Sequence, residues 1–127
     1  ATAGQDDAQL RYQEGQTWEY RTRPEDRGSL LRIQRIEANP AFANHGPIYH
    51  ISVIGVHFQG AALGGELAHL PVSRESLDAS VTRLSSASVT FPNADAGIAE
   101  WRSAQGGVFT IPLAEIVRSV EQMLQQR

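Results

Sequence analysis

The sequence predicts one α+β domain: an antiparallel β-meander of three to four strands packed against two or three helices, the last of them C-terminal. Three observations support this prediction. Polar and apolar residues alternate early in the chain, β-branched residues concentrate near its middle, and an amphipathic stripe lies near its end. The length of 127 residues suits a single domain.

Residues 1–11 are small and acidic apart from Leu10 and Arg11, so we expect a disordered or loosely packed segment ahead of a domain that spans residues 12–127. The chain starts with Ala-Thr-Ala-Gly rather than Met, which we interpret as a processed or trimmed start. Small polar starts of this kind are common after signal-cleavage sites and lipoprotein anchors. We therefore expect a bacterial protein that is periplasmic or lipoprotein-anchored, with a cytoplasmic location as the alternative.

Residues 12–37 are predicted to form a β-hairpin against which the later elements pack. In its first strand Trp18, Tyr20 and Thr22 alternate with polar residues, which is the period of a half-buried strand. Residues 23–28 supply a proline and a glycine for the turn. This stretch therefore has one apolar face for the core and one polar face.

The second and third strands are predicted at residues 29–37 and 48–58. Leu31 and Ile33 share a face, whereas Ile36 is out of phase with them. Either a β-bulge near Gln34 and Arg35 or burial of both faces would account for that change of phase. The high density of β-branched residues in the third strand favours a central position with both faces covered.

Residues 59–68 are rich in glycine and are predicted to form a loop. A helix follows, because Ser73 can cap free backbone N–H groups and an apolar stripe continues to about Ser85. The members of this stripe are Leu77, Val81 and Leu84. Residues 87–91 are expected to be extended.

A second helix is predicted at residues 93–104, with Ile98 and Trp101 facing inward and Gly106 ending it. Residues 108–111 read as a short strand. The last helix is predicted to begin at Pro112, where the missing N–H costs little. Its apolar face comprises Leu113, Ile116, Val117, Val120 and Leu124.

The composition excludes several classes of function. A formal charge of -3 and an isoelectric point near 5.8 argue against nucleic-acid binding. The absence of cysteine excludes disulfides and thiolate chemistry. No apolar run approaches the ~20 residues of a membrane span. We expect no cofactor.

The histidines His45, His50, His57 and His69 are the candidate metal ligands or bases. His50 and His57 are seven residues apart on one predicted strand, so they should point to opposite faces, and no metal site is predicted. No nucleophilic-serine motif frames any serine. The remaining candidate is a pocket between sheet and helices, gated by residues 59–69, with His50, His57, His69 and Glu66 as its polar residues.

The polar face of the hairpin and its turn carry many arginines, and arginine is enriched at the centres of interfaces. This pattern favours a non-enzymatic module that binds another protein, such as a bacterial immunity or inhibitor-type protein acting on a toxin or effector encoded by a neighbouring gene. The predicted contact residues are Glu19, Arg21, Arg23, Arg27 and Arg32. The alternative is a solvated sheet face with weak cross-strand ion pairs.

Four motifs resemble a family of small uncharacterised bacterial proteins. They are Tyr-x-x-Gly-Gln-x-Trp-x-Tyr-x-Thr-Arg-Pro at 12–24, Ile-Tyr-His-Ile-Ser-Val at 48–53, Leu-Pro-Val-Ser at 70–73 and Gly-Val-Phe-Thr-Ile-Pro-Leu-Ala-Glu-Ile-Val at 107–117. The resemblance covers nearly the whole chain after residue 11. It implies a bacterial single-domain protein and carries over no activity and no catalytic residue.

Three functions stay open at this point. The first is the protein-binding module described above. The second is a small-ligand-binding or hydrolytic domain that uses the gated pocket. The third is a structural subunit that forms a homodimer through a sheet edge or the apolar face of the last helix.

Overall fold

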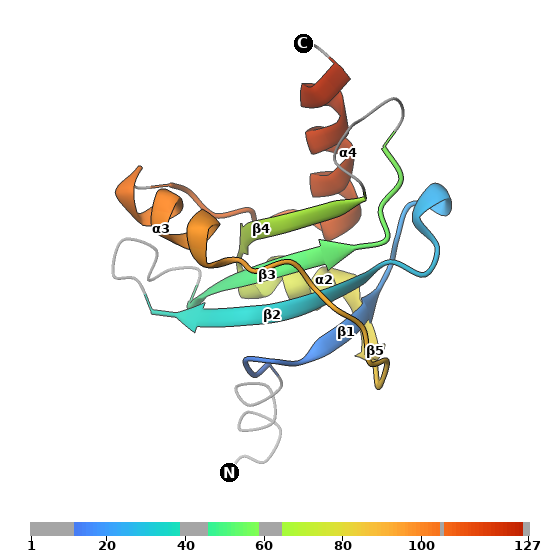
Figure 1. Ribbon diagram of the computed structural model, residues 1–127, viewed down its shortest axis with the longest axis horizontal. Helices are drawn as coiled ribbons and strands as arrows, with labels where there is room; N and C mark the ends of the chain where they lie inside the picture. Colours follow the sequence, from blue (N-terminus) through green and yellow to red (C-terminus); the bar gives the residue numbers. More distant parts are fainter. Residues whose placement is uncertain (1–11, 39–45, 59–64, 105, 126–127) are drawn as a thin grey trace.

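The structure, a computed structural model, describes residues 12–38, 46–58, 65–104 and 106–125. Its centre is a five-stranded antiparallel sheet in the order β4-β3-β2-β1-β5 (Figure 1). The strands are β1 (Thr17–Tyr20), β2 (Leu30–Glu37), β3 (Ile48–Ile54), β4 (Glu66–Val72) and β5 (Val81–Leu84). The helices are α2 (Arg74–Ser80), α3 (Asp95–Ser103) and α4 (Leu113–Gln125). The predicted α+β fold with a C-terminal helix is confirmed.

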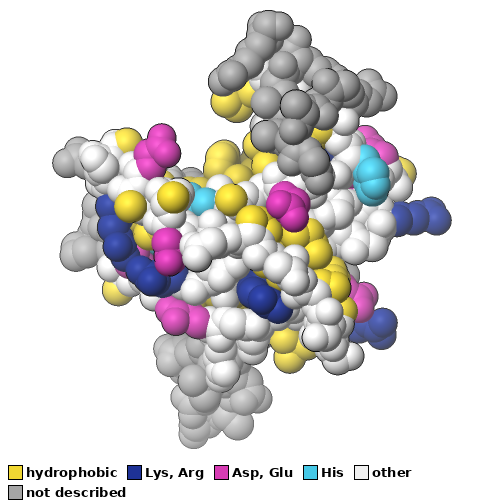
Figure 2. All heavy atoms as spheres, viewed as in Figure 1, with side chains coloured by type: hydrophobic (Ala, Val, Ile, Leu, Met, Phe, Trp, Pro, Cys, Tyr) yellow, Lys and Arg dark blue, Asp and Glu magenta, His cyan; other side chains and the backbone are white. Residues whose placement is uncertain are grey.

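The two faces of the sheet are covered differently. Helices α2 and α4 pack on one face, which we call the core face. The other face, the second face, is crossed by residues 85–94, which we call the crossing segment, and carries α3 at one end (Figure 1). Figure 2 views the second face, where basic side chains lie at separate places rather than in one patch.

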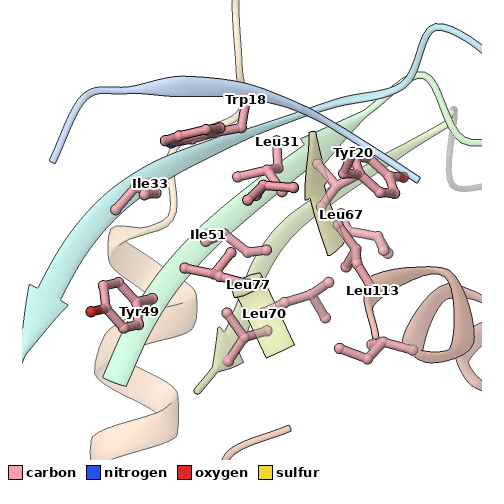
Figure 3. Close-up of a cluster of buried hydrophobic side chains, with 14 of the residues drawn as sticks. Trp18, Tyr20, Leu31, Ile33, Tyr49, Ile51, Leu67, Leu70, Leu77 and Leu113 are labelled. Carbon is pink, nitrogen blue, oxygen red and sulfur yellow. The ribbon is translucent and has the colours of Figure 1, made fainter. Parts of the chain in front are cut away.

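The core face gathers the apolar side chains of the alternating strands. Leu31, Ile33, Ile51 and Val53 are fully buried there, against Leu77 of α2 and Leu113 of α4 (Figure 3). Each large side chain removed from water in this way contributes about 1.5–3 kcal/mol. The apolar face of α4 belongs to this core, since Leu113, Ile116 and Val117 are buried in it.

The predicted hairpin is confirmed. β1 pairs with β2 antiparallel, and the turn between them contains a short 3₁₀ helix, Pro24–Asp26, followed by Gly28 at a φ of 88°. The register between β2 and β3 shifts between Ile33 and Arg35. This irregularity is the bulge predicted near Gln34 and Arg35, and it lets Ile36 pack against the core.

Four other predictions are corrected. Residues 66–68 belong to β4 rather than to a loop, and the predicted third strand ends early, at Ile54. The first helix ends at Ser80, after which β5 pairs with the outer edge of β1. This pairing satisfies the backbone N–H and C=O groups at the outer edge of β1. Val81 is buried in β5, as it would also have been in the predicted helix. In the predicted strand at 108–111, Phe109 forms an isolated bridge with Val72.

The remaining helix predictions are confirmed. The Ser73 hydroxyl accepts the N–H of Ser76 and caps α2, and Ile98 and Trp101 of α3 face inward. Several predictions lie outside the described residues: those for residues 1–11, for 39–45 including His45, and for 59–64. The side chain of Leu124 lies outside them too. None of the helices in the described ranges has the length and apolar character to cross a bilayer.

Candidate functional site

The five predicted contact residues do not share one surface. Arg21 is exposed beside α2, where its Nη1 donates to the carbonyl of Ala79. Glu19 and Arg27 lie at the turn end of the second face. Arg23 is only 2% exposed, and Arg32 is half-buried under the crossing segment. Arg23 is therefore not accessible as a contact residue.

Arg23 instead fixes the turn from inside. Its Nε donates to Asp26 Oδ2 at 2.6 Å, and its Nη1 donates to Glu121 Oε1 of α4 at 2.8 Å. Asp26 Oδ1 also accepts the backbone N–H of His57 at 2.7 Å. The hydrogen bond that Arg23 donates to Asp26 raises the pKa of Arg23, and this effect is larger than that of burial, which lowers it. This buried network joins the hairpin turn, the segment after β3 and the last helix.

A second buried contact lies beside that network. Ser29 Oγ donates to the carbonyl of Ile54 at 2.6 Å, so it must accept from the Tyr20 hydroxyl, 2.7 Å away. Burial raises the pKa of Tyr20 to about 12. The last residue of β1, Tyr20, and the residue before β2, Ser29, are thus hydrogen-bonded to each other, and Ser29 is also bonded to β3.

The middle of the second face is covered by the crossing segment. The Arg32 guanidinium lies 4.6 Å from the ring centre of Phe91, and its Nη2 donates to the carbonyl of Val89 at 3.4 Å. Gln34 Nε2 donates to the carbonyl of Pro92 at 3.2 Å. These side chains satisfy the carbonyls of a segment that has no regular structure, so Arg32 acts inside the fold.

A hollow of about 410 Å³ opens between the hairpin turn and the start of the crossing segment. Its charged residues are Glu19 and Arg27. Glu19 Oε2 accepts from Arg83 Nε at 3.1 Å, whereas Arg27 has no ion-pair partner among the described residues. The other lining residues are Tyr20, Thr22, Gly28, Ser29, Leu30, Ser85 and Ala87.

The predicted pocket residues separate into two pairs. His57 and Glu66 line another hollow of about 410 Å³, also at the turn end of the sheet. His50 and His69 lie together at the opposite end, beneath α3. A third hollow, of about 420 Å³, is lined by Pro71, Trp101 and residues 107–109.

His50 and His69 form the middle of a hydrogen-bonded chain. Glu37 Oε1 lies 3.2 Å from His50 Nε2, and His50 Nδ1 lies 2.8 Å from His69 Nε2. Arg102 binds the Glu37 carboxylate with two hydrogen bonds, which lower the pKa of Glu37. The ionised carboxylate can only accept, so neutral His50 donates from Nε2 and accepts at Nδ1 from His69.

Burial lowers the pKa of both histidines, that of His69 to about 4. Both imidazoles are therefore neutral at pH 7 and weak as bases. Neither histidine lines any of the three hollows described above. The described residues contain no group of three side chains suited to holding a metal ion.

Sequence reasoning missed Asp26, Glu121, Glu37 and Arg102 as members of these networks. Asp26 carried a signal, because an aspartate at the end of a turn is placed to accept backbone N–H groups. Glu121 and Arg102 reach their partners across the fold, and no local pattern indicates such contacts. The pairing of His50 with His69 depends on β4, which was predicted as loop over its first residues.

No protein-family model matches the chain, and no curated protein or solved structure shows significant similarity to it. The resemblance to small bacterial proteins stays a prediction.

Proposed function

We propose that this protein is a non-enzymatic protein-binding module, of the immunity or inhibitor type, that binds a bacterial toxin or effector through the turn end of its second face. The observation that carries the proposal is the hollow beside Arg27, a guanidinium without an ion-pair partner among the described residues. An arginine fork matches a carboxylate with two hydrogen bonds. The expected occupant is therefore an acidic side chain or terminal carboxylate of the partner.

The rigidity of the surrounding backbone supports this proposal. Arg27 follows directly on the buried pair of Arg23 and Asp26, and Gly28 precedes Ser29, which is tied to Ile54. A surface that is ordered before binding loses less conformational entropy on association. The turn is thus held in place by residues that do not themselves contact the partner.

The contact set differs from the one predicted from sequence. Glu19 and Arg27 remain in it, Arg21 lies outside the hollow, and Arg23 and Arg32 support the surface from within. The alternative of a homodimer through the apolar face of α4 loses support, because the described residues of that face are in the core.

The test is co-purification with the product of a neighbouring gene, followed by titration with charge-reversal variants. We expect Arg27→Glu to weaken the complex by roughly 100-fold or more, since placing like charges together costs several kcal/mol. Arg118→Glu is the matched control, because Arg118 is an exposed arginine of α4, which packs on the core face. Equal affinity of Arg27→Glu and Arg118→Glu for the partner would overturn the site.

A further inference from the structure

Helix α3 rests on the histidine pair at one point where no side chain intervenes. A Cβ added at Gly97 would lie 2.5 Å from His69 Cβ and 3.1 Å from His69 Nδ1. Only a glycine allows the helix backbone to approach the imidazole so closely. This contact explains a glycine inside a helix, which otherwise costs stability.

Two further side chains of α3 complete its attachment. The Trp101 ring packs edge-on against His50, with ring centres 4.9 Å apart, and its Nε1 donates to the carbonyl of Gly107 at 2.8 Å. Arg102 holds Glu37, the first member of the hydrogen-bonded chain. Helix α3 therefore contacts every member of the hydrogen-bonded group Glu37, His50 and His69.

The two hydrogen bonds among Glu37, His50 and His69 persist when one proton is added, but they cannot both persist when both rings are protonated. With one added proton, three of the four imidazole nitrogens carry hydrogen, and one of the three is His69 Nδ1, which a Cβ added at Gly97 would approach to 3.1 Å. His69 Nδ1 has no hydrogen-bond partner among the described residues. A second proton places two positive rings in contact, with N–H facing N–H across 2.8 Å.

The surrounding charges offset the cost of protonating the two histidines only in part. Glu37 of β2 favours protonation of His50, while Arg102 of α3 and Arg35 of β2 oppose it. Arg35 is itself 3.9 Å from Asp95 at the start of α3. Among the described residues no carboxylate acts on His69, where burial and His50 both disfavour the charge.

We propose that Glu37, His50 and His69 form an acid-sensitive latch for α3, so that protonation of the histidines releases the helix from the sheet. Release uncovers Ile98 and Trp101, which are 2% and 9% exposed in the docked state. The latch acts at the end of the sheet away from Arg27, and it does not depend on the proposed partner.

The direction follows from the pKa of His69. Its docked value of about 4 lies below the ordinary 6.5, so the released state binds more protons as the pH falls between these values. Docking is strongest above pH 6.5, and the docking equilibrium weakens on the order of 100-fold by pH 4.

Amide hydrogen exchange by NMR measures this equilibrium, with each rate corrected for the intrinsic effect of pH. We expect protection of amides in residues 98–103, and of the Trp101 indole, to fall on the order of 100-fold between pH 7 and pH 4. Amides of β2 and β3, and the indole of Trp18, should change far less. A uniform loss of protection across sheet and helix would overturn the proposal.

Three variants separate the latch from general acid denaturation. His69→Gln keeps a donor toward His50 but cannot titrate, so most of the pH effect on α3 should disappear. His57→Gln, at an exposed histidine of the other end, is the matched control and should titrate like the unaltered chain. Gly97→Ala should loosen α3 at pH 7 already, and it tests the contact even if His69→Gln does not fold. Identical pH profiles for His69→Gln and His57→Gln, or full protection of α3 in Gly97→Ala, would refute the latch.

Discussion

The two ends of the sheet bury polar groups in opposite ways. At the turn end, Arg23 and Asp26 are buried as a charged pair whose hydrogen bonds also include Glu121 and the backbone of His57. At the α3 end, His50 is buried and His69 is half-buried, and both are neutral rings. The first pair is held by opposite charges at 2.6 Å, whereas the second pair consists of neutral rings that lose this state when they take up protons. The first arrangement suits a fixed support and the second suits a sensor.

The largest expected effect comes from breaking the charged pair. Arg23→Ala leaves Asp26 buried without its counter-charge, and we expect a loss of about 3–5 kcal/mol in the free energy of unfolding. Urea denaturation at pH 7 measures it. Arg21→Ala, two residues earlier and exposed, is the control and should change stability by less than about 0.5 kcal/mol. Similar losses in both variants would mean that the pair is not the support of the turn.

The next effect is that of pH on the neutral pair. Because the pKa of His69 is lowered to about 4 from 6.5, the unfolded chain takes up its proton first as the pH falls. The contribution of His69 to stability is complete above pH 6.5 and should decline by about 2–3 kcal/mol toward pH 4. Urea denaturation of the unaltered chain and of His69→Gln across this range should diverge. Parallel curves of stability against pH would contradict the assignment of this pH effect to His69.

A smaller effect is expected from filling the space between α3 and His69. Gly97→Ala forces the helix or the ring to move and should cost about 1–3 kcal/mol. Gly107→Ala is a suitable control, since an added Cβ there meets nothing within 4 Å. Thermal or urea unfolding of the two variants should separate them clearly. Equal stability would show that α3 does not rest closely on His69.

The smallest effect concerns the exposed ion pair of Glu19 and Arg83, at 3.1 Å. It joins the same kinds of group as the buried pair but lies in water. We expect Arg83→Ala to change stability by less than about 0.5 kcal/mol. A loss as large as that of Arg23→Ala would remove burial as the cause of the difference between the two pairs.

The parts of the fold that follow from local patterns were predictable. The alternation at Trp18 and Tyr20, the change of phase at Ile36, and the cap at Ser73 each depend on neighbouring residues, and each prediction is confirmed. Strand β5 was not predictable in this way, because Val81 fits a helical stripe equally well. Residues 81–84 form a strand because they pair with the outer edge of β1, which lies far away in sequence.

The candidate sites were harder to predict for a related reason. Composition cannot tell a buried arginine from an exposed one, so Arg23 was predicted as a contact residue although it is among the least exposed residues of the hairpin. Whether a polar residue on the second face meets water depends on the crossing segment. Gly97 lies inside a helix, where glycine is unfavourable, yet it marks the place where α3 meets the histidines.

The strand order also bears on how the chain folds. Trp18 pairs with Leu31 across a short turn, but it pairs with Leu84 only after the chain has passed through three further strands and a helix. Contacts between residues so distant in sequence form slowly, because closing the long loop has an entropic cost. We therefore expect the meander from β1 to β4 to assemble first and β5 to join it late. Until then the outer edge of β1 is open, and this is the stage at which a folding chain is most exposed to pairing with a neighbour.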